Sequence, residues 1–150
     1  MGVKMRIPDY GDEYLLFGLL AHNSNRLQVL GDSFYDEITT KQWFVIAMLE
    51  VFGDDHPTLN ELSKDIGSSH QNVKQLVLKL EQKGYVTMYT DPTDRRKSRI
   101  KLNEKFEEVR CKYKSKQVQF IKKLYYNIDS EELKVAVRVM LKMQENMEEM

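Results

Sequence analysis

The chain has 150 residues, which suits one domain or one domain with a dimerisation extension. Hydrophobic residues make up 41% and charged residues 31%, a composition typical of a water-soluble globular protein. We expect no membrane span, because no run of about 18 apolar residues occurs, and no signal peptide, because the first ten residues lack an apolar core. The single cysteine excludes an internal disulfide and favours a reducing, cytoplasmic location.

After a loose lead-in of ten residues, the first predicted element is a long helix from about Asp12 to Leu30, ended by Gly31-Asp32-Ser33. Its leucines share one broad arc of the helical wheel. His22, Asn23 and Arg26 fall in the same arc, and buried polar groups need hydrogen-bond partners. Two interpretations remain open: these side chains meet partners across a dimer seam or stay partly wet, or they line a ligand cavity.

A second helix is predicted to begin at Thr39, where Gln42 stands at capping-box spacing. Residues 43–52 are apolar nearly all round, so we expect this helix to be buried on several sides. Its aromatic and Met side chains are interpreted first as core; the alternative is that some of them wall an effector cavity with polar residues of the first helix. The residues of this candidate effector pocket are His22, Arg26, Trp43, Phe44 and Met48.

Two further helices follow, separated by a tight turn. Thr58 and Glu61 have capping-box spacing at the start of the first, and Gly67 ends it, because glycine adopts the left-handed conformation without a steric penalty. Ser68 and Gln71 repeat the capping-box spacing, which predicts the start of the second. That helix has an apolar stripe on one face and an uncharged-to-basic face opposite. The pattern is that of a helix-turn-helix, whose Gln, Asn and Lys side chains can reach base edges and phosphates in a major groove.

Alternation of apolar and polar residues then predicts two strands, over 85–90 and 98–102. Asp91-Pro92 ends the first strand, because proline fixes its own backbone dihedral and biases the residue before it. An isolated two-stranded ribbon is marginal in water. We therefore expect the ribbon to pack against the helices and to project as a wing.

The loop between the strands carries Arg95, Arg96 and Lys97 at its tip, and Asp94 is spaced to orient Arg96 or Arg99. Charged loops are usually just solvated. Here, however, the tip is rich in Arg, the residue that fits a narrow and negative minor groove. We therefore interpret the loop as a DNA contact.

Charge is unevenly divided along the chain. Between Lys64 and Lys101 there are nine Lys and Arg against four Asp and Glu, a net charge of +5, so the rest of this formally neutral chain carries −5. The basic part coincides with the predicted helix-turn-helix and wing, as an electrostatic footprint for DNA should. The candidate DNA-binding residues are Ser68, Ser69, His70, Gln71, Asn72, Lys74, Gln75, Lys79, Arg95, Arg96, Lys97 and Arg99.

After the wing, a long helix is predicted from Asn103 to about Asn127, and a final helix begins where Asp129 and Glu132 have capping-box spacing. Their apolar stripes cannot all be buried on a compact winged helix. With the first helix they are expected to form a dimer interface. The fold class is therefore mainly α with a small β wing, divided into a helical dimerisation region, residues 1–38 and 103–150, and a winged helix-turn-helix domain, residues 39–102.

Catalysis has little support. The three histidines are scattered, no His/Cys/carboxylate cluster has metal-ligand spacing, and there is no nucleophile elbow or glycine-rich phosphate loop. We therefore expect no enzyme activity, metal or cofactor. Cys111 lies between Arg110 and Lys112, and neighbouring cations favour the reactive thiolate; the simpler interpretation is a structural or incidental cysteine.

The segment S-S-H-Q-N-V-K-Q-L-V-L-K-L-E-Q-K-G-Y-V, residues 68–86, resembles the recognition helix and start of the wing in the MarR-type bacterial transcription regulators. Asp94, Arg96 and Arg99 match that family's D-x-R-x-x-R wing signature, and the similarity runs over about residues 10–148. The resemblance implies a homodimer, usually a repressor, that binds a pseudo-palindromic operator in double-stranded DNA. It also implies release by a small aromatic or lipophilic effector or by thiol oxidation.

Two alternatives stay open. One is a winged helix used as a protein-interaction module without sequence-specific DNA binding, although such a module has no need of a basic recognition face. The other is a redox-sensing regulator acting through Cys111. The family's peroxide-sensing branch keeps its reactive cysteine in the first helix, where this chain has none.

Overall fold

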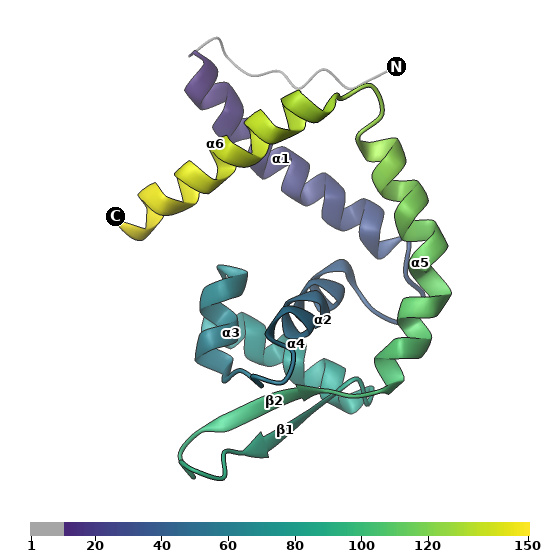
Figure 1. Ribbon diagram of the computed structural model, residues 1–150, viewed down its shortest axis with the longest axis vertical. Helices are drawn as coiled ribbons and strands as arrows, with labels where there is room; N and C mark the ends of the chain where they lie inside the picture. The colour runs from purple at the N-terminus through teal and green to yellow at the C-terminus, as the bar shows by residue number, and fades with distance from the viewer. Residues whose placement is uncertain (1–10) are drawn as a thin grey trace. The chain divides into compact units, whose positions relative to one another are not determined.

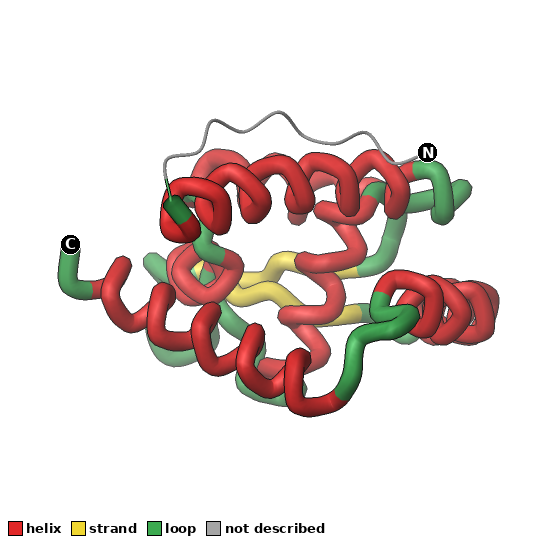
Figure 2. The backbone as a smooth tube through the Cα atoms, turned by 90° about the horizontal axis from the view of Figure 1, so that it is seen from above, coloured by secondary structure: helices red, strands yellow, loops and turns green. Residues whose placement is uncertain are grey.

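The computed structural model describes residues 11–150, so the expected lead-in of residues 1–10 lies outside the described residues. These residues form a first compact unit that ends at Val109 and a second unit of residues 110–150. The expected class, mainly α with one small sheet, is confirmed (Figures 1 and 2). The elements are α1 (Asp12–Asp32), α2 (Thr40–Phe52), α3 (Leu59–Ile66), α4 (His70–Gln82), β1 (Val86–Thr90), β2 (Ser98–Leu102), α5 (Lys105–Leu124) and α6 (Ser130–Glu148).

The core of the first unit lies where α2 packs against α3, α4 and β2. Each element contributes the apolar residues that share one face at its own period, which is how the sequence pattern selects helix or strand. Burial of these side chains removes apolar surface from water and is the main stabilising contribution of the unit. The fully buried members are Val45, Ile46, Leu62, Val73, Val77, Leu80, Val86 and Ile100.

Fewer faces of α2 are buried than its apolar composition predicts. Gln42, Val45, Ile46 and Leu49 are buried, but Val51 is 79% exposed and Phe44 43% exposed. The expectation of a helix buried on several sides is therefore wrong for the single chain. The physical reason is that the core formed with α3, α4 and β2 takes up one face of α2, the face of residues 42, 45, 46 and 49.

The junction between α1 and α2 also differs from expectation. Gly31 does not break α1, which continues to Asp32. A Cβ at Gly31 would collide with the side chain of Thr40. Thr40 also donates hydrogen bonds to Asp32 Oδ1 (2.7 Å, from its backbone N–H) and to the Gln28 carbonyl (3.2 Å, from its hydroxyl). The glycine therefore permits close packing of the end of α1 on the start of α2.

The predicted capping boxes at Thr39 and Thr58 are both present, and Gly67 ends α3 with φ of 67°. The start of α4 is one residue later than expected. Ser69, not Ser68, is the N-cap, and its hydroxyl accepts the backbone N–H of Asn72 at 3.3 Å. Ser68 belongs instead to the end of α3, where its N–H donates back to the Ser63 carbonyl at 3.1 Å.

The ribbon pairs β1 and β2 in the expected antiparallel arrangement, with Val86 opposite Leu102 and Thr90 opposite Ser98. It is attached to the loop before α3, because the Ile100 N–H donates to the Pro57 carbonyl at 2.9 Å. Figure 1 shows the ribbon projecting away from α2, α3 and α4. The expectation that it packs at its base and extends as a wing is confirmed.

In the second unit, α6 begins at the predicted capping box. Asp129 accepts the N–H groups of Glu131 and Glu132, both at 2.8 Å. Before it, Asn127 has a positive φ of 60°, where the chain turns out of α5. None of the described helices is long and apolar enough to cross a lipid bilayer.

Candidate nucleic-acid interface

The outer face of α4 is polar and open to solvent. Val73, Val77 and Leu80 fix the inner face by full burial, which turns the opposite residues outward. Of the candidate DNA-binding residues in and before this helix, all are exposed except Ser68, which is half-buried. The exposed ones are Ser69, His70, Gln71, Asn72, Lys74, Gln75 and Lys79.

The base of the wing is organised by Asp91, a residue that the sequence suggested only as a strand breaker. Its side chain is 5% exposed. Its Oδ1 accepts hydrogen bonds from the Thr93 N–H (2.7 Å), the Thr93 hydroxyl (2.6 Å) and the Asp94 N–H (3.1 Å). Its Oδ2 accepts one from Arg99 Nε at 2.6 Å. The Thr93 hydroxyl, followed by Arg99, holds the pKa of the Asp91 carboxyl well below its usual range.

The spacing of Asp91, Thr93 and Asp94 is that of an Asx turn, in which a side-chain oxygen accepts backbone N–H groups two and three residues later. That local signal was available in the sequence. The contact with Arg99 was not, because it depends on the pairing of the two strands.

Arg99 lies at the base of the wing rather than at its tip. Besides Asp91, its guanidinium donates to the His56 carbonyl at 2.9 Å and lies 3.8 Å from Glu61. The hydrogen bond with Asp91 is the largest cause of the raised pKa of Arg99. The Arg99 guanidinium is therefore directed at groups within the protein.

Asp94 pairs with Arg96, one of the two arginines for which it was considered. Its Oδ1 lies 3.2 Å from Arg96 Nε and also accepts the Arg96 N–H at 3.1 Å. These hydrogen bonds lower the pKa of the Asp94 carboxyl. The loop is closed by hydrogen bonds from the Asp91 N–H to the Lys97 carbonyl and from the Lys97 N–H to the Asp94 carbonyl, both at 2.9 Å.

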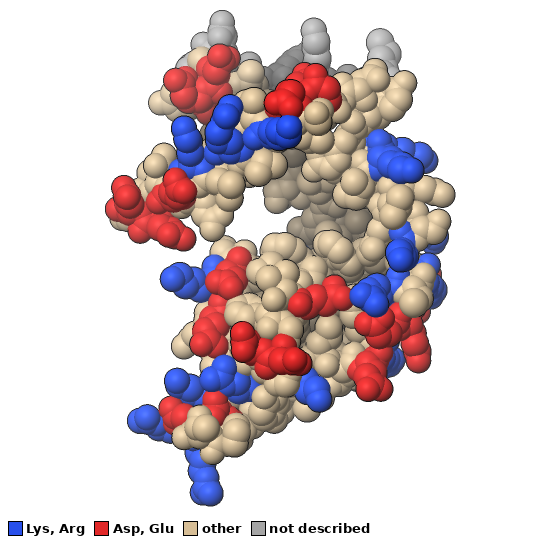
Figure 3. All heavy atoms as spheres, viewed as in Figure 1, with Lys and Arg blue, Asp and Glu red and all other residues tan. Residues whose placement is uncertain are grey.

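Three cations remain at the tip of this closed loop. Arg95, Arg96 and Lys97 are exposed, and the Arg96 side chain keeps 91% of its surface in solvent despite the contact with Asp94. Figure 3 shows Lys and Arg side chains gathered over the wing. The wing is therefore a hydrogen-bonded loop with exposed cationic side chains at its end, which suits contact with a phosphate backbone or a narrow groove.

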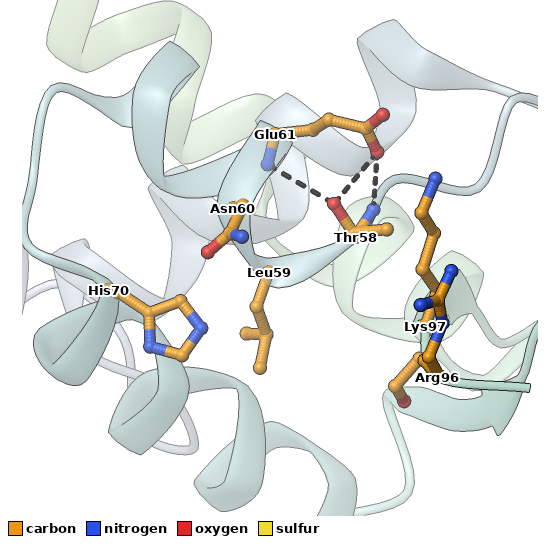
Figure 4. A pocket seen from close by; sticks show the side chains of 8 residues that line it. Thr58, Leu59, Asn60, Glu61, His70, Arg96 and Lys97 are labelled. Carbon is orange, nitrogen blue, oxygen red and sulfur yellow. Dashed lines mark hydrogen bonds between the residues drawn. The ribbon is translucent and has the colours of Figure 1, made fainter.

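A hollow of about 290 Å³ separates the wing from the start of α3 and the first residue of α4 (Figure 4). Arg96 and Lys97 line it from the wing, and His70 from α4. Glu61 lines it too, but its carboxylate is held in the α3 cap by the Thr58 N–H (2.7 Å) and hydroxyl (2.9 Å). These hydrogen bonds lower the pKa of Glu61. The hollow joins the recognition face and the wing into one surface.

A second hollow, of about 850 Å³, lies between α1, α2 and α4. Of the five candidate effector-pocket residues, only Phe44 lines it. Trp43 instead stacks on Tyr35, with ring centroids 6.5 Å apart and planes 19° from parallel. The other three do not line either hollow. The residues that surround this second hollow are Ser24, Leu27, Gln28, Thr40, Lys41, Phe44, Ile66, Gly67, Ser68, Asn72, Gln75 and Leu76.

The described part of the chain offers little for metal binding or thiol chemistry. No group of three or more His, Cys, Asp or Glu side chains is placed there to hold a metal ion. Cys111 is exposed on α5.

A helix-turn-helix with a polar, basic second helix, followed by a two-stranded ribbon with a cationic tip, defines the winged helix-turn-helix class. Residues 37–97 match the model of the MarR family, a family of transcription regulators and not of enzymes. The match confirms the resemblance seen in the recognition helix and the wing signature.

Solved structures share the fold over most of the chain. A MarR/EmrR family transcriptional regulator from Acinetobacter sp. ADP1 has a TM-score of 0.80 at 19% identity, covering 92% of this chain and 98% of that one. MepR of S. aureus, solved as a DNA complex, has 0.75 at 21%, covering 91% and 98%. BpsR of Bordetella bronchiseptica, whose DNA binding is regulated by 6-hydroxynicotinic acid, has 0.74 at 18%, covering 87% and 98%.

Proposed function

We propose that the protein is a cytoplasmic transcription regulator, acting as a repressor, that binds a pseudo-palindromic DNA operator as a homodimer. The observation that carries this proposal is that two surfaces of one compact unit meet at a shared hollow. The polar face of α4 and the cationic wing tip border the same hollow, through His70 on one side and Arg96 and Lys97 on the other. The DNA complex of MepR, which has the same fold, supports it.

In this mechanism α4 enters the major groove, where Gln and Asn side chains can pair with adenine edges and Lys with guanine or phosphate. The wing follows the adjacent backbone, and its arginines reach the minor groove. Two copies related by a two-fold axis require half-sites about 10 bp apart. The base contacts are proposed for Ser69, His70, Gln71, Asn72, Lys74 and Gln75.

The dimer is proposed because apolar side chains are exposed on the helices outside the winged helix. On α1, Phe17 is 72% and Val29 61% exposed; on α6, Val137 and Met140 are about half exposed. Contiguous exposed apolar surface marks an interaction site. We propose that a second copy of the chain covers this apolar surface. Residues 1–38 and 103–150 would then form the dimerisation region, and residues 39–102 the DNA-binding domain.

A small aromatic or lipophilic effector is proposed to bind the hollow between α1, α2 and α4. Leu27, Phe44 and Leu76 provide apolar walls from three helices, and Lys41 provides a cation. The volume of this hollow, about 850 Å³, falls within the range of ligand pockets, roughly 300–1,000 Å³. An effector releases DNA only if it binds one arrangement of α1 and α4 better than the other.

The decisive experiment is in vitro selection of bound duplexes from a random library, followed by gel shifts at several salt concentrations. We expect an enriched motif with two mirrored halves, and an affinity that falls with a slope of about −0.9 for each neutralised phosphate. A protein-interaction module would enrich no motif. A monomer that ignores duplex DNA in dilute buffer would refute the proposal.

The effector proposal has its own test. Thermal unfolding with a panel of aromatic acids and lipophilic compounds should show a stabilising ligand that also weakens the gel shift. Phe44→Ala should reduce both effects, whereas Val51→Ala, on the same helix but outside the hollow, should leave both unchanged.

A further inference from the structure

The carboxyl-terminal end of α4 makes contacts that are separate from its outer face. Lys83, the residue after the helix, donates from Nζ to the Glu37 carbonyl at 2.5 Å and to Gln42 Oε1 at 3.3 Å. These acceptors lie 46 and 41 residues earlier in the chain. The ammonium group is thus directed at oxygens of the protein.

A second residue after α4, Tyr85, also contacts Glu37. Tyr85, which is buried, donates its hydroxyl to the carboxylate of Glu37 at 2.9 Å. The backbone carbonyl of Glu37 and its side chain therefore accept hydrogen bonds from two residues at the end of the recognition helix. Two hydrogen bonds to Glu37 restrict both the distance and the rotation of the end of α4 relative to this residue.

The second acceptor of Lys83, Gln42, is part of the capping box at the start of α2. It is 2% exposed, and the Oε1 that accepts from Lys83 also accepts the Thr39 N–H at 3.1 Å in the cap of α2. The atom that caps α2 therefore also holds the end of α4. A displacement of the first turn of α2 must move Lys83 or break this hydrogen bond.

Residues 33–39 connect α1 to α2, and this connector is held at two places. Its two ends are brought together, because Gly31 and Thr40 are in contact and Asp32 accepts the Thr40 N–H. Within the connector, Glu37 accepts hydrogen bonds from Lys83 and Tyr85. Hydrogen bonds and packed atoms therefore link the end of α1, the start of α2 and Glu37 to the end of α4.

We propose that Lys83 and Tyr85 are positioning residues, which clamp the end of α4 to the connector 33–39 and couple the placement of α1 to the orientation of α4 on DNA. This inference rests on the proposed function for its DNA consequence, but the clamp itself is a property of the protein alone. Coupling requires an element whose arrangement both sites bias, and in this proposal the connector is that element.

The first test is hydrogen exchange on the full chain carrying Lys83→Met, which keeps much of the alkyl chain and removes the ammonium group. Exchange should rise in residues 33–39 and 79–85 together, and stay unchanged in α3, which the clamp does not touch. The matched control is Lys79→Met, the same change one turn earlier, at an exposed side chain. It should leave exchange unchanged in both segments.

The second test is DNA affinity as a function of salt, on the selected duplex. Lys83→Met should bind at least about fivefold more weakly with an unaltered salt slope, because Lys83 neutralises no phosphate. Lys79→Met should instead reduce the slope by about 0.9. Lys83→Arg, which keeps a donor cation, should restore binding, and Tyr85→Phe should reproduce part of the defect without removing a charge.

The outcomes separate the clamp from the proposed function. If Lys83→Met and Tyr85→Phe both leave exchange in 33–39 unchanged, the clamp is wrong. A fall in salt slope for Lys83→Met would also overturn it, since Lys83 would then be a phosphate contact. Failure of every variant and of the unaltered protein to bind any duplex would refute the proposed function, while the exchange data would still decide the clamp.

Discussion

Arg99 donates a hydrogen bond of 2.6 Å from its Nε to the Oδ2 of Asp91, across the base of the wing. The other oxygen of Asp91 is occupied by the Thr93 and Asp94 donors, so the carboxylate joins the turn after β1 to strand β2. Arg99 continues the chain of contacts to the His56 carbonyl before α3. The geometry of the wing tip therefore depends on a charge pair that lies well behind it.

Asp91→Asn should loosen the wing. The amide keeps one acceptor oxygen but turns a donor or a neutral oxygen toward the guanidinium of Arg99. We expect a lower midpoint of urea unfolding at pH 7 and about tenfold weaker DNA binding, because a mobile wing must be ordered when DNA binds. Asp94→Asn, whose partner Arg96 is almost fully solvated, is the control and should change the unfolding midpoint less. Equal effects of the two variants would contradict the central role of Asp91.

The same pair predicts a pH dependence. The pKa of Asp91 is lowered in the folded protein, so its stabilising contribution is complete above the unfolded value of about 3.9 and is lost as pH falls through the folded value. The stability difference between the unaltered protein and Asp91→Asn should be constant from about pH 8 to 5 and shrink below about 4. Urea unfolding at pH 7 and at acid pH measures it; a difference that grows in acid would have the wrong sign.

The wing tip should contribute affinity without sequence preference. Arg95→Ala combined with Arg96→Ala should weaken binding to all duplexes and reduce the salt slope by about 1.8 if each arginine neutralises one phosphate. Gln71→Ala with Gln75→Ala offers the contrast, since uncharged base contacts should relax specificity and leave the slope unchanged. Fluorescence anisotropy at several salt concentrations distinguishes them. An unaltered slope in the arginine variant would argue against the wing as a phosphate contact.

The position of the α4 cap can be tested by stability alone. Ser69→Ala removes the oxygen that accepts the Asn72 N–H and should lower the free energy of unfolding by about 1 kcal/mol. Ser68→Ala should have a smaller effect, because the hydrogen bond of Ser68 to Ser63 comes from its backbone. Urea titration of both variants is sufficient. The reverse order would place the cap at Ser68.

The dimer proposal predicts a single-site disruption on α6. Met140→Glu puts a charge into the apolar stripe, and we expect monomers at micromolar concentration by sedimentation or light scattering, with loss of high-affinity operator binding. Lys142→Glu, on the opposite side of the helix by its spacing, should leave the dimer intact. A Met140→Glu protein that remains dimeric would move the interface away from this stripe.

Cys111 is expected to be a bystander. DNA binding by the unaltered protein and by Cys111→Ser should be the same with and without hydrogen peroxide, because no second cysteine exists in the chain to form an internal disulfide. The measurement is a gel shift before and after oxidation. Release of DNA that occurs only when Cys111 is present would instead establish a thiol sensor.

The sequence by itself determined the local elements: the capping boxes at Thr39, Thr58 and Asp129, the stop at Gly67 and the two strands of the wing. Each of these depends on residues within about one turn or one strand of each other, so composition and spacing are enough. The placement of the polar face of α4 opposite Val73, Val77 and Leu80 follows for the same reason.

Only the tertiary structure decided which side chains hold α4 and the wing in place. Asp91 meets Arg99 only after the strands pair, Gly31 meets Thr40 only when α1 and α2 pack, and Lys83 meets Glu37 across 46 residues. Contacts between distant residues depend on how elements pack against one another, and that packing is set by the whole core rather than by any local spacing.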